Sequence, residues 1–300
     1  MQQEQEQELK PAIFLATLLL ISMAAVPAIA APISGSWIID ARDKEERVDL
    51  ILRRSWNKGG RKGAWSHSTD IAPSELRGFR KTDGPVSISI VREAGTLRLD
   101  GEMDHGRASG QFTFEADPTF AADLKRAGFG DATDEDLLRC CTHDVGRDWF
   151  RNFQSLGLRE LTLDGLFRLS AHGVKPEFVR ALSAAGYATL EVDDVVRLQV
   201  HGVSVDYVRG LGTSSGKKPS TDEIVRYKVH GLEPSYVSSL SRWFDPEEMV
   251  RLHLHGVSAD YVREFRSMGY QSASVDDLVR LRNHGVSPAF ARRARSSMDG

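Results

Sequence analysis

The sequence predicts an α+β protein in which a small antiparallel β domain, residues 34–116, precedes an α-solenoid or helical-hairpin array, residues 117–300. Apolar residues stand at every second position in the first part, which is the period of a half-buried strand. After Asp117 the period changes to that of a helix face. A motif then recurs about every 29 residues, the separation of His172 and His201, which is typical of two-helix repeats that cover one another's apolar faces.

The composition describes a folded chain of 300 residues, long enough for two domains, with 41% apolar and 27% charged residues. Its isoelectric point is about 6.3. Nucleic acid is not expected as a partner, because a nucleic-acid-binding surface needs a basic patch. The only two cysteines, Cys140 and Cys141, are adjacent, and a disulfide between neighbours strains the backbone. Cys140 stands where other repeats have Leu or Tyr, which indicates a small buried core residue.

The N-terminal segment predicts a signal peptide, residues 1–30. Residues 11–36 carry no charge, residues 12–26 are strongly apolar, and Ala28 and Ala30 are the small residues that a signal peptidase needs. We therefore expect a periplasmic or secreted protein. The alternative is an inner-membrane anchor made by residues 11–31, because the segment before Lys10 is acidic whereas a signal normally begins with basic residues. Pro27 interrupts the apolar run, which favours cleavage.

About five antiparallel strands are expected in the β domain. The alternating apolar runs begin at Trp37, Val48, Val86, Leu97 and Phe112. A short hairpin turn is predicted at residues 93–96, and residues 101–110 are interpreted as a longer connection before the last strand.

A long connection is predicted for residues 56–78, and it contains a candidate binding loop. The loop combines glycine, basic and aromatic residues, and its candidate binding residues are Trp56, Lys58, Arg61, Lys62 and Trp65. Loops carry binding residues when a rigid scaffold positions them. The alternative is a surface connection that binds nothing.

Each repeat is expected to contain a helix that ends in the motif Arg, three residues, His, Gly and an apolar residue, followed by a second helix. Acidic residues fill the first turn of the first helix, and the glycine is expected to take positive φ just beyond its end. The second helix opens with proline in several repeats and carries an aromatic residue with an apolar residue four positions later, so both lie on one face. The predicted structural turns are His172 and Gly173, His201 and Gly202, His230 and Gly231, His255 and Gly256, and His284 and Gly285, with a degenerate copy at His143.

The turn histidines are assigned a structural role. Neighbouring packed helices lie ~8–10 Å apart, whereas two imidazoles on one zinc ion need nitrogen atoms within ~2.1 Å of the metal. Equivalent histidines therefore cannot share an ion, and neither a metal nor a cofactor is expected. Each ring is instead expected to satisfy a free carbonyl at the end of its helix, where the helix dipole favours a positive group.

The arginines of the motif are expected to form ion pairs within their own helices, because an acidic residue stands four positions before each of them. The pairs are Asp164 and Arg168, Asp193 and Arg197, Asp222 and Arg226, Glu247 and Arg251, and Asp276 and Arg280. The alternative is a stripe of guanidinium groups that binds phosphate or carboxylate.

The polar loop at residues 212–218 contains Ser214 two residues from a glycine on either side, as a hydrolase nucleophile elbow does. An elbow joins a strand to a helix, whereas this loop is expected to join two helices. Gly212 and Gly216 also enclose one residue too few for a phosphate-binding loop. A hydrolase is therefore the least favoured interpretation.

The motif resembles the histidine-glycine-valine helical repeats of exported bacterial proteins of largely unknown function. In such proteins a β-rich segment often precedes the repeats, and some copies are appended to membrane metallopeptidases of the antibiotic-sensor type. The resemblance covers residues 34–300 and implies an envelope protein that binds something. The His-Glu-x-x-His motif of those peptidases does not occur in this sequence, so their activity is not expected.

These observations favour a non-enzymatic exported binding or scaffolding protein that acts on a protein or peptide partner in the cell envelope. Variable side chains of the stacked helices are expected to share one surface; examples are Ser170, Gln199, Lys228, His253 and Arg282. The alternative is an envelope sensor that binds a small ligand in the β domain through Trp56 and Trp65. Contact with a membrane is expected only if the N-terminal segment is not cleaved.

Overall fold

The computed structural model describes residues 32–42, 46–58, 61–212 and 218–297. The predicted signal peptide and Ser214 lie outside these ranges, and the side chains of Lys58 and Arg61 are likewise outside the described part. The sheet and the helices belong to one compact unit that begins at Pro32. Among the described residues, no helix has the length and apolarity that a membrane crossing requires.

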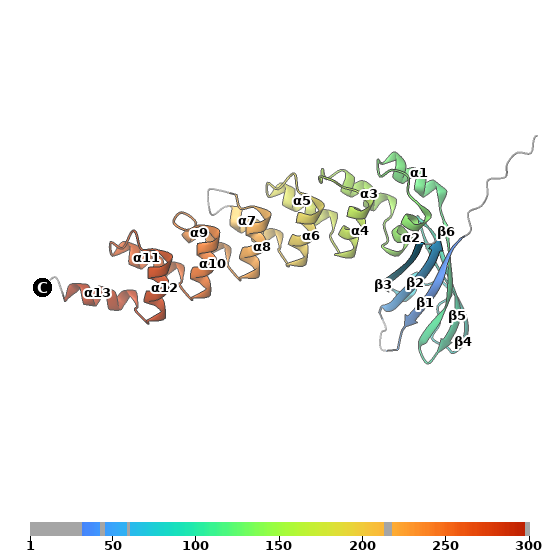
Figure 1. Cartoon of the computed structure of the whole chain (residues 1–300), viewed down its shortest axis with the longest axis horizontal. Coiled ribbons are helices and arrows are strands. Elements are labelled where there is room, and N and C mark those ends of the chain that lie inside the picture. The colour runs from blue at the N-terminus through green and yellow to red at the C-terminus, as the bar shows by residue number, and fades with distance from the viewer. Residues whose placement is uncertain (1–31, 43–45, 59–60, 213–217, 298–300) are drawn as a thin grey trace, which may run out of the picture. The chain divides into compact units, whose positions relative to one another are not determined.

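The described part of the chain forms a six-stranded antiparallel sheet followed by 13 helices, which confirms the predicted α+β fold (Figure 1). The strands are β1 (Ile33–Asp40), β2 (Val48–Lys58), β3 (Arg61–Ile71), β4 (Gly84–Arg92), β5 (Gly95–Asp104) and β6 (Arg107–Ala116). Their order is β3-β2-β1-β6-β5-β4, so β3 and β4 lie at the two edges. A short 3₁₀ helix, η1 (Pro73–Glu75), lies in the connection between these two edges, and Arg77 forms an isolated bridge to Ser89 of β4.

Two predictions about the sheet are wrong. Residues 56–78 are not a long connection, because β3 occupies residues 61–71 and pairs with β2 along its whole length, from Val48 opposite Ile71 to Lys58 opposite Arg61. Residues 101–110 are not a long connection either, since β5 and β6 run through them to a tight turn at His105 and Gly106. The predicted turn at residues 93–96 is confirmed, with Glu93 and Ala94 at its tip.

A tryptophan lies across a pair of glycines on the buried face of the sheet. Trp37 of β1 is opposite Gly110 of β6, and Gly110 is opposite Gly101 of β5. The indole Nε1 donates to the carbonyl oxygens of Asp100 (3.2 Å) and Gln111 (3.1 Å). Because Asp100 belongs to β5, the ring extends across β6, where glycine leaves room for it. Trp37 is almost completely buried.

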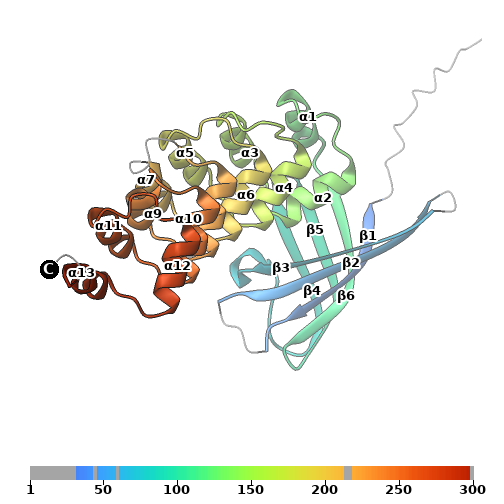
Figure 2. The same cartoon turned by 60° about the vertical axis from the view of Figure 1, so that its left-hand side comes forward.

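The helices are short and alternate between two rows, which Figures 1 and 2 show side by side. The odd-numbered row contains α1 (Pro118–Arg126), α3 (Arg147–Gln154), α5 (Pro176–Ala184), α7 (Val205–Gly212), α9 (Pro234–Leu240), α11 (Ala259–Ser267) and α13 (Pro288–Ser296). The even-numbered row contains α2 (Asp134–Thr142), α4 (Leu163–Ala171), α6 (Val192–Val200), α8 (Thr221–Val229), α10 (Pro246–Leu254) and α12 (Val275–Asn283). Each helix contacts the next member of its own row, from α4 to α12 and from α3 to α13, so neighbouring repeats supply one another's apolar cover.

The turns between even and odd helices have the predicted backbone. The five motif glycines have φ between 64° and 72°. In the turn after α6, the Val203 N–H donates to the Leu198 carbonyl (3.0 Å) and the Gly202 N–H to the Gln199 carbonyl (3.0 Å), which closes the helix as a Schellman motif does. In the degenerate repeat Asp144 takes the glycine position with φ 54°.

The expected hydrogen bonds from the histidine rings to the helix-end carbonyls are not formed. The five rings are exposed and make no hydrogen bond to any described residue. The carbonyls at the helix ends are satisfied by the backbone N–H groups that follow them. Because the turn closes with main-chain bonds alone, the imidazoles are left facing solvent.

The helices join the sheet through α2, which packs on β5 and β6. Cys140 and Cys141 of α2 are buried and free, as expected for core residues. Burial raises the pKa of both thiols to about 12, so neither is a thiolate near neutral pH.

Candidate functional site

Four arginines of the motif pair with the following repeat, not with the acid four positions before them as predicted; Arg197 also binds Asp194, three positions before it in its own helix, at 3.1 Å. The pairs are Arg139 with Asp164 (2.8 Å), Arg168 with Asp193, Arg197 with Asp222 (2.6 Å) and Arg251 with Asp276. The intrahelical prediction failed because equivalent helices of an array run in the same direction, and each arginine lies beside the acidic first turn of the next even-numbered helix. We call this row of ion pairs the arginine ladder.

The sheet supplies the first rung of the arginine ladder. Arg54 of β2 binds Glu135 of α2 at 2.8 Å, and Glu135 stands four positions before Arg139, where the acid of a rung belongs. The ladder is interrupted at Arg226, near which no described acidic side chain lies within ion-pair distance. This gap falls in the shortened repeat, between His230 and His255. The exposed rungs contribute ~0–1 kcal/mol each, and their arginines are occupied by carboxylates, which argues against the phosphate-binding alternative.

A row of exposed apolar side chains runs across three adjacent even-numbered helices. Val200, Val229 and Leu254 each stand directly before a turn histidine and are 57%, 58% and 64% exposed. They supply half of the exposed large apolar side chains in the described part of the chain. We call them the apolar row. Single exposed apolar residues are ordinary, but a contiguous group marks an interaction surface.

The apolar row was not identified from the sequence, although the signal is present. The residue before each turn histidine is Ala171, Val200, Val229, Leu254 and Asn283 in successive repeats. An apolar residue there looks like part of the helix core pattern. Only the helix-end geometry, which turns this position away from the neighbouring row, leaves it in solvent.

Three of the variable residues predicted to form a binding surface lie against aromatic rings of the preceding repeat. The Lys228 Nζ lies 5.0 Å from the Tyr207 ring centre, and the Arg282 guanidinium lies 5.9 Å from that of Tyr261. The His253 ring meets the Tyr236 ring edge-on, with centroids 5.3 Å apart. Among the others, Ser170 donates to the His143 carbonyl at 2.8 Å.

The tyrosines of the odd-numbered helices connect each repeat to the next, which the sequence did not reveal. The Tyr207 hydroxyl donates to the Leu232 carbonyl (2.6 Å), and the Tyr261 hydroxyl donates to the Val286 carbonyl (2.8 Å). Tyr236 makes the equivalent bond to Val257. Each acceptor is the apolar residue that ends a motif.

The candidate binding loop is a strand hairpin, and its tryptophans are engaged within the protein. Trp56 lies opposite Gly63, where an added Cβ would come within 2.4 Å of the indole. The guanidinium of Arg54 lies over Trp56, 5.4 Å from the ring centre. Trp65 stacks on His67 with centroids 5.7 Å apart. Lys62, the other candidate whose side chain is described, is exposed.

Two histidines meet where this hairpin contacts the helices. The rings of His67 on β3 and His143 after α2 lie edge-on with centroids 4.6 Å apart, and His143 also contacts the Phe167 ring. The Nε2 atom of His67 is buried without a hydrogen-bond partner in the described residues. Burial lowers the pKa of His67, and Arg139 adds to the effect. Burial is the main cause that lowers the pKa of His143 to about 4, and the charges of His67 and Arg139 lower it further.

The lowered pKa of His143 predicts a loss of stability in mild acid. In the unfolded chain the ring has its ordinary pKa of about 6.5, so between pH ~6.5 and ~4 the unfolded state binds a proton that the folded state does not. The free energy of unfolding therefore falls as the pH falls through this window. We expect His143→Gln, which cannot be charged, to show a flatter profile in urea unfolding at pH 7, 5.5 and 4.5. Equal slopes for both proteins would contradict the assignment.

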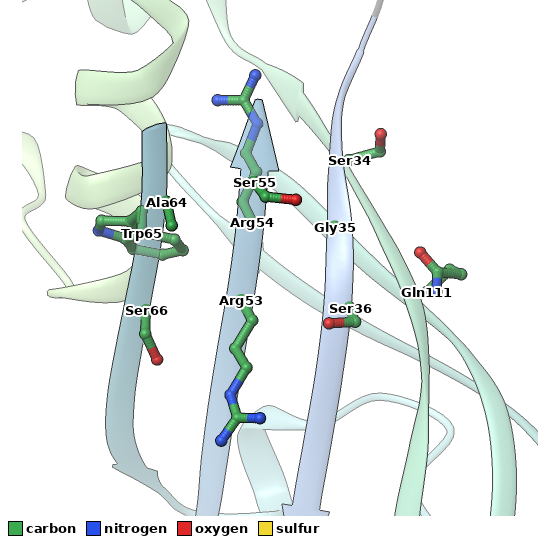
Figure 3. Close-up of a pocket in the computed structure, with 10 residues that line it drawn as sticks. All are labelled: Ser34, Gly35, Ser36, Arg53, Arg54, Ser55, Ala64, Trp65, Ser66 and Gln111. Carbon is green, nitrogen blue, oxygen red and sulfur yellow. The ribbon is translucent and has the colours of Figure 1, made fainter. Parts of the chain in front are cut away.

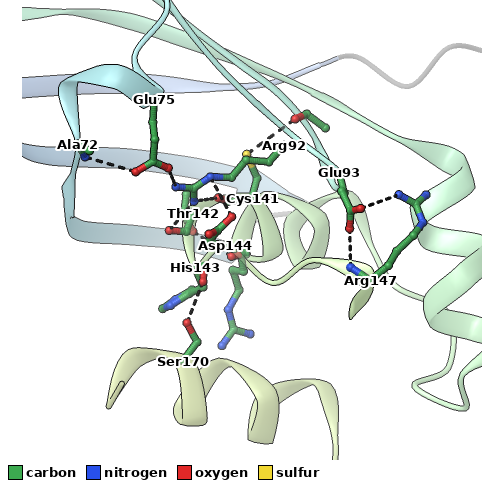
Figure 4. Close-up of polar contacts among 12 residues, drawn as sticks. Ala72, Glu75, Arg92, Glu93, Cys141, Thr142, His143, Asp144, Arg147 and Ser170 are labelled. Atoms are coloured by element: carbon green, nitrogen blue, oxygen red, sulfur yellow. Dashed lines mark hydrogen bonds and ion pairs between the residues drawn. The ribbon is translucent and has the colours of Figure 1, made fainter. Parts of the chain in front are cut away.

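The sheet and helices are also held together around Arg92 (Figure 4). Its guanidinium donates to the Cys141 carbonyl (2.5 Å) at the end of α2 and to the Glu75 carboxylate (2.7 Å) of η1. Its Nε lies 3.3 Å from the carboxylate of Asp144. Beside it, the Glu93 carboxylate accepts the backbone N–H of Arg147 at the start of α3.

A shallow depression of about 660 Å³ lies on the first strands of the sheet. Figure 3 shows Arg53 and four serines around it, with Trp65 directed toward the helices. The lining residues are Ser34, Gly35, Ser36, Arg53, Arg54, Ser55, Ala64, Trp65, Ser66 and Gln111. Such a surface offers hydrogen bonds and one free guanidinium, which suits a small polar or anionic molecule.

One group of side chains in the described residues has the spacing of metal ligands, and it does not include a turn histidine. It consists of Asp83, Asp104 and His105, all exposed. The Asp104 carboxylate is bonded to the His105 Nδ1 (2.5 Å), and the Asp83 carboxylate accepts the His105 backbone N–H (2.8 Å). The hydrogen bond from Asp104 raises the pKa of His105. These hydrogen bonds stabilise the turn between β5 and β6, which accounts for the proximity of the three side chains without a metal ion.

Comparison with known proteins gives no relative. No protein-family model, no curated protein and no solved structure matches this chain. The resemblance to exported histidine-glycine-valine repeat proteins therefore stays a prediction.

Proposed function

We propose that the protein is an exported, non-enzymatic scaffold whose apolar row binds a protein or peptide partner in the cell envelope. The observation that carries this proposal is the position of Val200, Val229 and Leu254 at equivalent places on three contacting helices. A partner with apolar side chains at a regular spacing would remove all three from water, at about 25 cal/mol per Å² of apolar area.

The construction of the array supports this proposal. Arginine-ladder pairs and tyrosine bonds hold successive repeats at a fixed separation. A fixed separation reduces the conformational entropy that is lost when a partner binds several repeats at once. The turn histidines stand next to the apolar row and leave its rim polar, which is typical of protein interfaces.

The proposal predicts a partner that is captured through the apolar row. We expect a photo-crosslinking amino acid at Val229 to yield one recurrent protein adduct in cells. The control position is Ala184 of α5, which is exposed on the other row and should not give that adduct. Changing Val200 and Leu254 to Asn, the residue that the last repeat carries at this place, should reduce the adduct at least tenfold while thermal stability stays unchanged.

The same experiment can reject the proposal. Equal adducts from positions 229 and 184 would show that the apolar row does not select a partner. An adduct that survives both Asn substitutions would place the contact elsewhere on the array.

The depression on the sheet supports a second candidate function, an envelope sensor that binds a small polar ligand in the β domain. Arg53 is exposed there and is surrounded by serines. A thermal-shift screen of small anions would detect such a ligand. Its stabilising effect should disappear in Arg53→Ala, and a ligand that stabilises both proteins equally would exclude this site.

A further inference from the structure

We propose that the face formed by α12 and α13, the last two described helices, binds an acidic amphipathic helix of a partner protein. This surface is separate from the apolar row, and the inference does not depend on the function proposed above. It follows from what covers the same positions in earlier repeats, apart from the interrupted rung at Arg226.

The first observation is an incomplete rung of the arginine ladder. Arg280 of α12 occupies the position of Arg251 in α10, which binds Asp276 of the next helix. Arg280 is exposed, and no described acidic side chain lies within ion-pair distance of it. At the other end of the ladder the sheet closes the row with Arg54 and Glu135. Within the described residues, the ladder is thus closed at its first rung, interrupted at Arg226 and open at its last rung.

The second observation is an uncovered aromatic side chain. Phe290 of α13 is 55% exposed, whereas the equivalent Tyr207 and Tyr261 are 8% and 6% exposed because the following repeat covers them. Among the described residues of α13 none is buried, although every other α-helix buries at least one. The half-buried Val286 and Leu281 continue the apolar surface toward Arg280.

The identity of residue 290 also bears on the partner. Each tyrosine at this position donates its hydroxyl to a carbonyl at the turn of the next repeat. Phenylalanine has no hydroxyl to satisfy. The partner must therefore cover an aromatic ring, but it does not need a turn of the same type at that point.

The charge of this face selects an acidic partner. Helices α12 and α13 carry five arginines, Arg280, Arg282, Arg292, Arg293 and Arg295, against two acidic residues, Asp276 and Asp277, of which Asp276 binds Arg251. Arg292 binds Glu264 of the preceding repeat at 3.2 Å. A second copy of the same face would bring like charges together, which costs free energy. A helix with carboxylates in its first turn would instead complete the rung at Arg280, as first-turn acids do in the repeats before it.

The probe for this site is a fluorescein-labelled peptide of residues 191–212 of this chain. It is a hairpin of the same repeat type, it has more acidic than basic residues, and its Asp193 accepts an arginine rung within the protein. We expect the intact protein to raise the anisotropy of the peptide with saturation. Phe290→Ala and Arg280→Glu should each weaken binding at least tenfold, because both side chains are exposed and neither change disturbs the fold.

A charge exchange distinguishes a direct rung from a general effect of charge. A peptide with Asp193→Lys should bind the natural protein poorly and should bind the Arg280→Glu protein with restored affinity. Lys175→Glu, a charge reversal at the exposed residue that precedes α5, is the matched control and should leave binding unchanged. No anisotropy change, or binding that neither Phe290→Ala nor Arg280→Glu weakens, would overturn the proposal. A dimer in sedimentation equilibrium that Phe290→Ala abolishes would also overturn it, since a second copy would then be the occupant.

Discussion

Replacing Gly110 with alanine is expected to lower the free energy of unfolding by about 3 kcal/mol or more, because overpacking that moves backbone atoms is among the costliest single changes. An added Cβ at Gly110 would lie 2.0 Å from the Asp100 carbonyl oxygen and 2.5 Å from the Gly101 Cα. Both are backbone atoms of β5 and cannot rotate away. The strands would have to separate where Trp37 donates to Asp100 and Gln111, so the hydrogen bonds of the indole would be lost as well.

Gly202→Ala provides the matched control for this experiment. Nothing lies within 4 Å of an added Cβ there, so the only cost is that of a positive φ, ~1–2 kcal/mol. In urea unfolding followed by tryptophan fluorescence, the free energy of unfolding of Gly110→Ala should therefore be well below that of Gly202→Ala. If the two variants lose the same stability, the close approach of β5 and β6 is not a constraint on this sheet.

Glycine explains why the sheet was predicted only in part from the sequence. A strand is recognised by alternating apolar side chains, and Gly101 and Gly110 interrupt that alternation without interrupting the strands. Gly63 does the same in β3, where the Trp56 ring covers it. Trp37 of β1 lies opposite Gly110 and is distant from it along the chain, so no local pattern reveals that partner. Trp56 covers Gly63 from the paired strand of the same hairpin.

The helical repeats were predicted more completely because their signals are local. Helix starts, proline positions and positive-φ glycines depend on residues a few positions apart. The contacts between repeats were not predictable in the same way. Arg197 has acids both within its own helix and in the next repeat, and only the packing of α6 beside α8 decides that Asp222 takes part in the ladder.

The candidate surfaces depend on the same distinction. The position of Val229 is regular in the sequence, but its exposure follows from the geometry at the end of α8. The open rung at Arg280 becomes visible only after the earlier rungs are known to join different repeats. An intrahelical pair with Asp276, which the sequence favoured, would have left no arginine available for a partner.

Arg92 is the residue whose loss should most directly uncouple the sheet from the helices. Its side chain is 16% exposed and joins three segments: β4, which carries it, the Glu75 carboxylate of η1, and the backbone at the end of α2. We expect Arg92→Ala to lower the free energy of unfolding by about 2–3 kcal/mol, because the Cys141 carbonyl and Glu75 would lose a charged donor in a partly buried place. The free energy of unfolding of Arg92→Lys should lie between those of the natural protein and Arg92→Ala. Lysine keeps the charge but lacks the planar fork that reaches both acceptors.

The control for Arg92→Ala is Arg98→Ala, which removes an exposed ion pair with Glu115 from the same sheet and should change stability by less than ~1 kcal/mol. Arg92 connects the sheet with the helical array. Its loss should therefore allow the two to unfold at different urea concentrations. In a background in which the other four tryptophans are replaced by Phe, unfolding followed by circular dichroism at a helix wavelength and by the fluorescence of Trp37 should coincide with Arg92 present and separate in Arg92→Ala. Coincident curves at an unchanged midpoint would mean that the apolar contacts of α2 with β5 and β6 are sufficient to couple the sheet to the array.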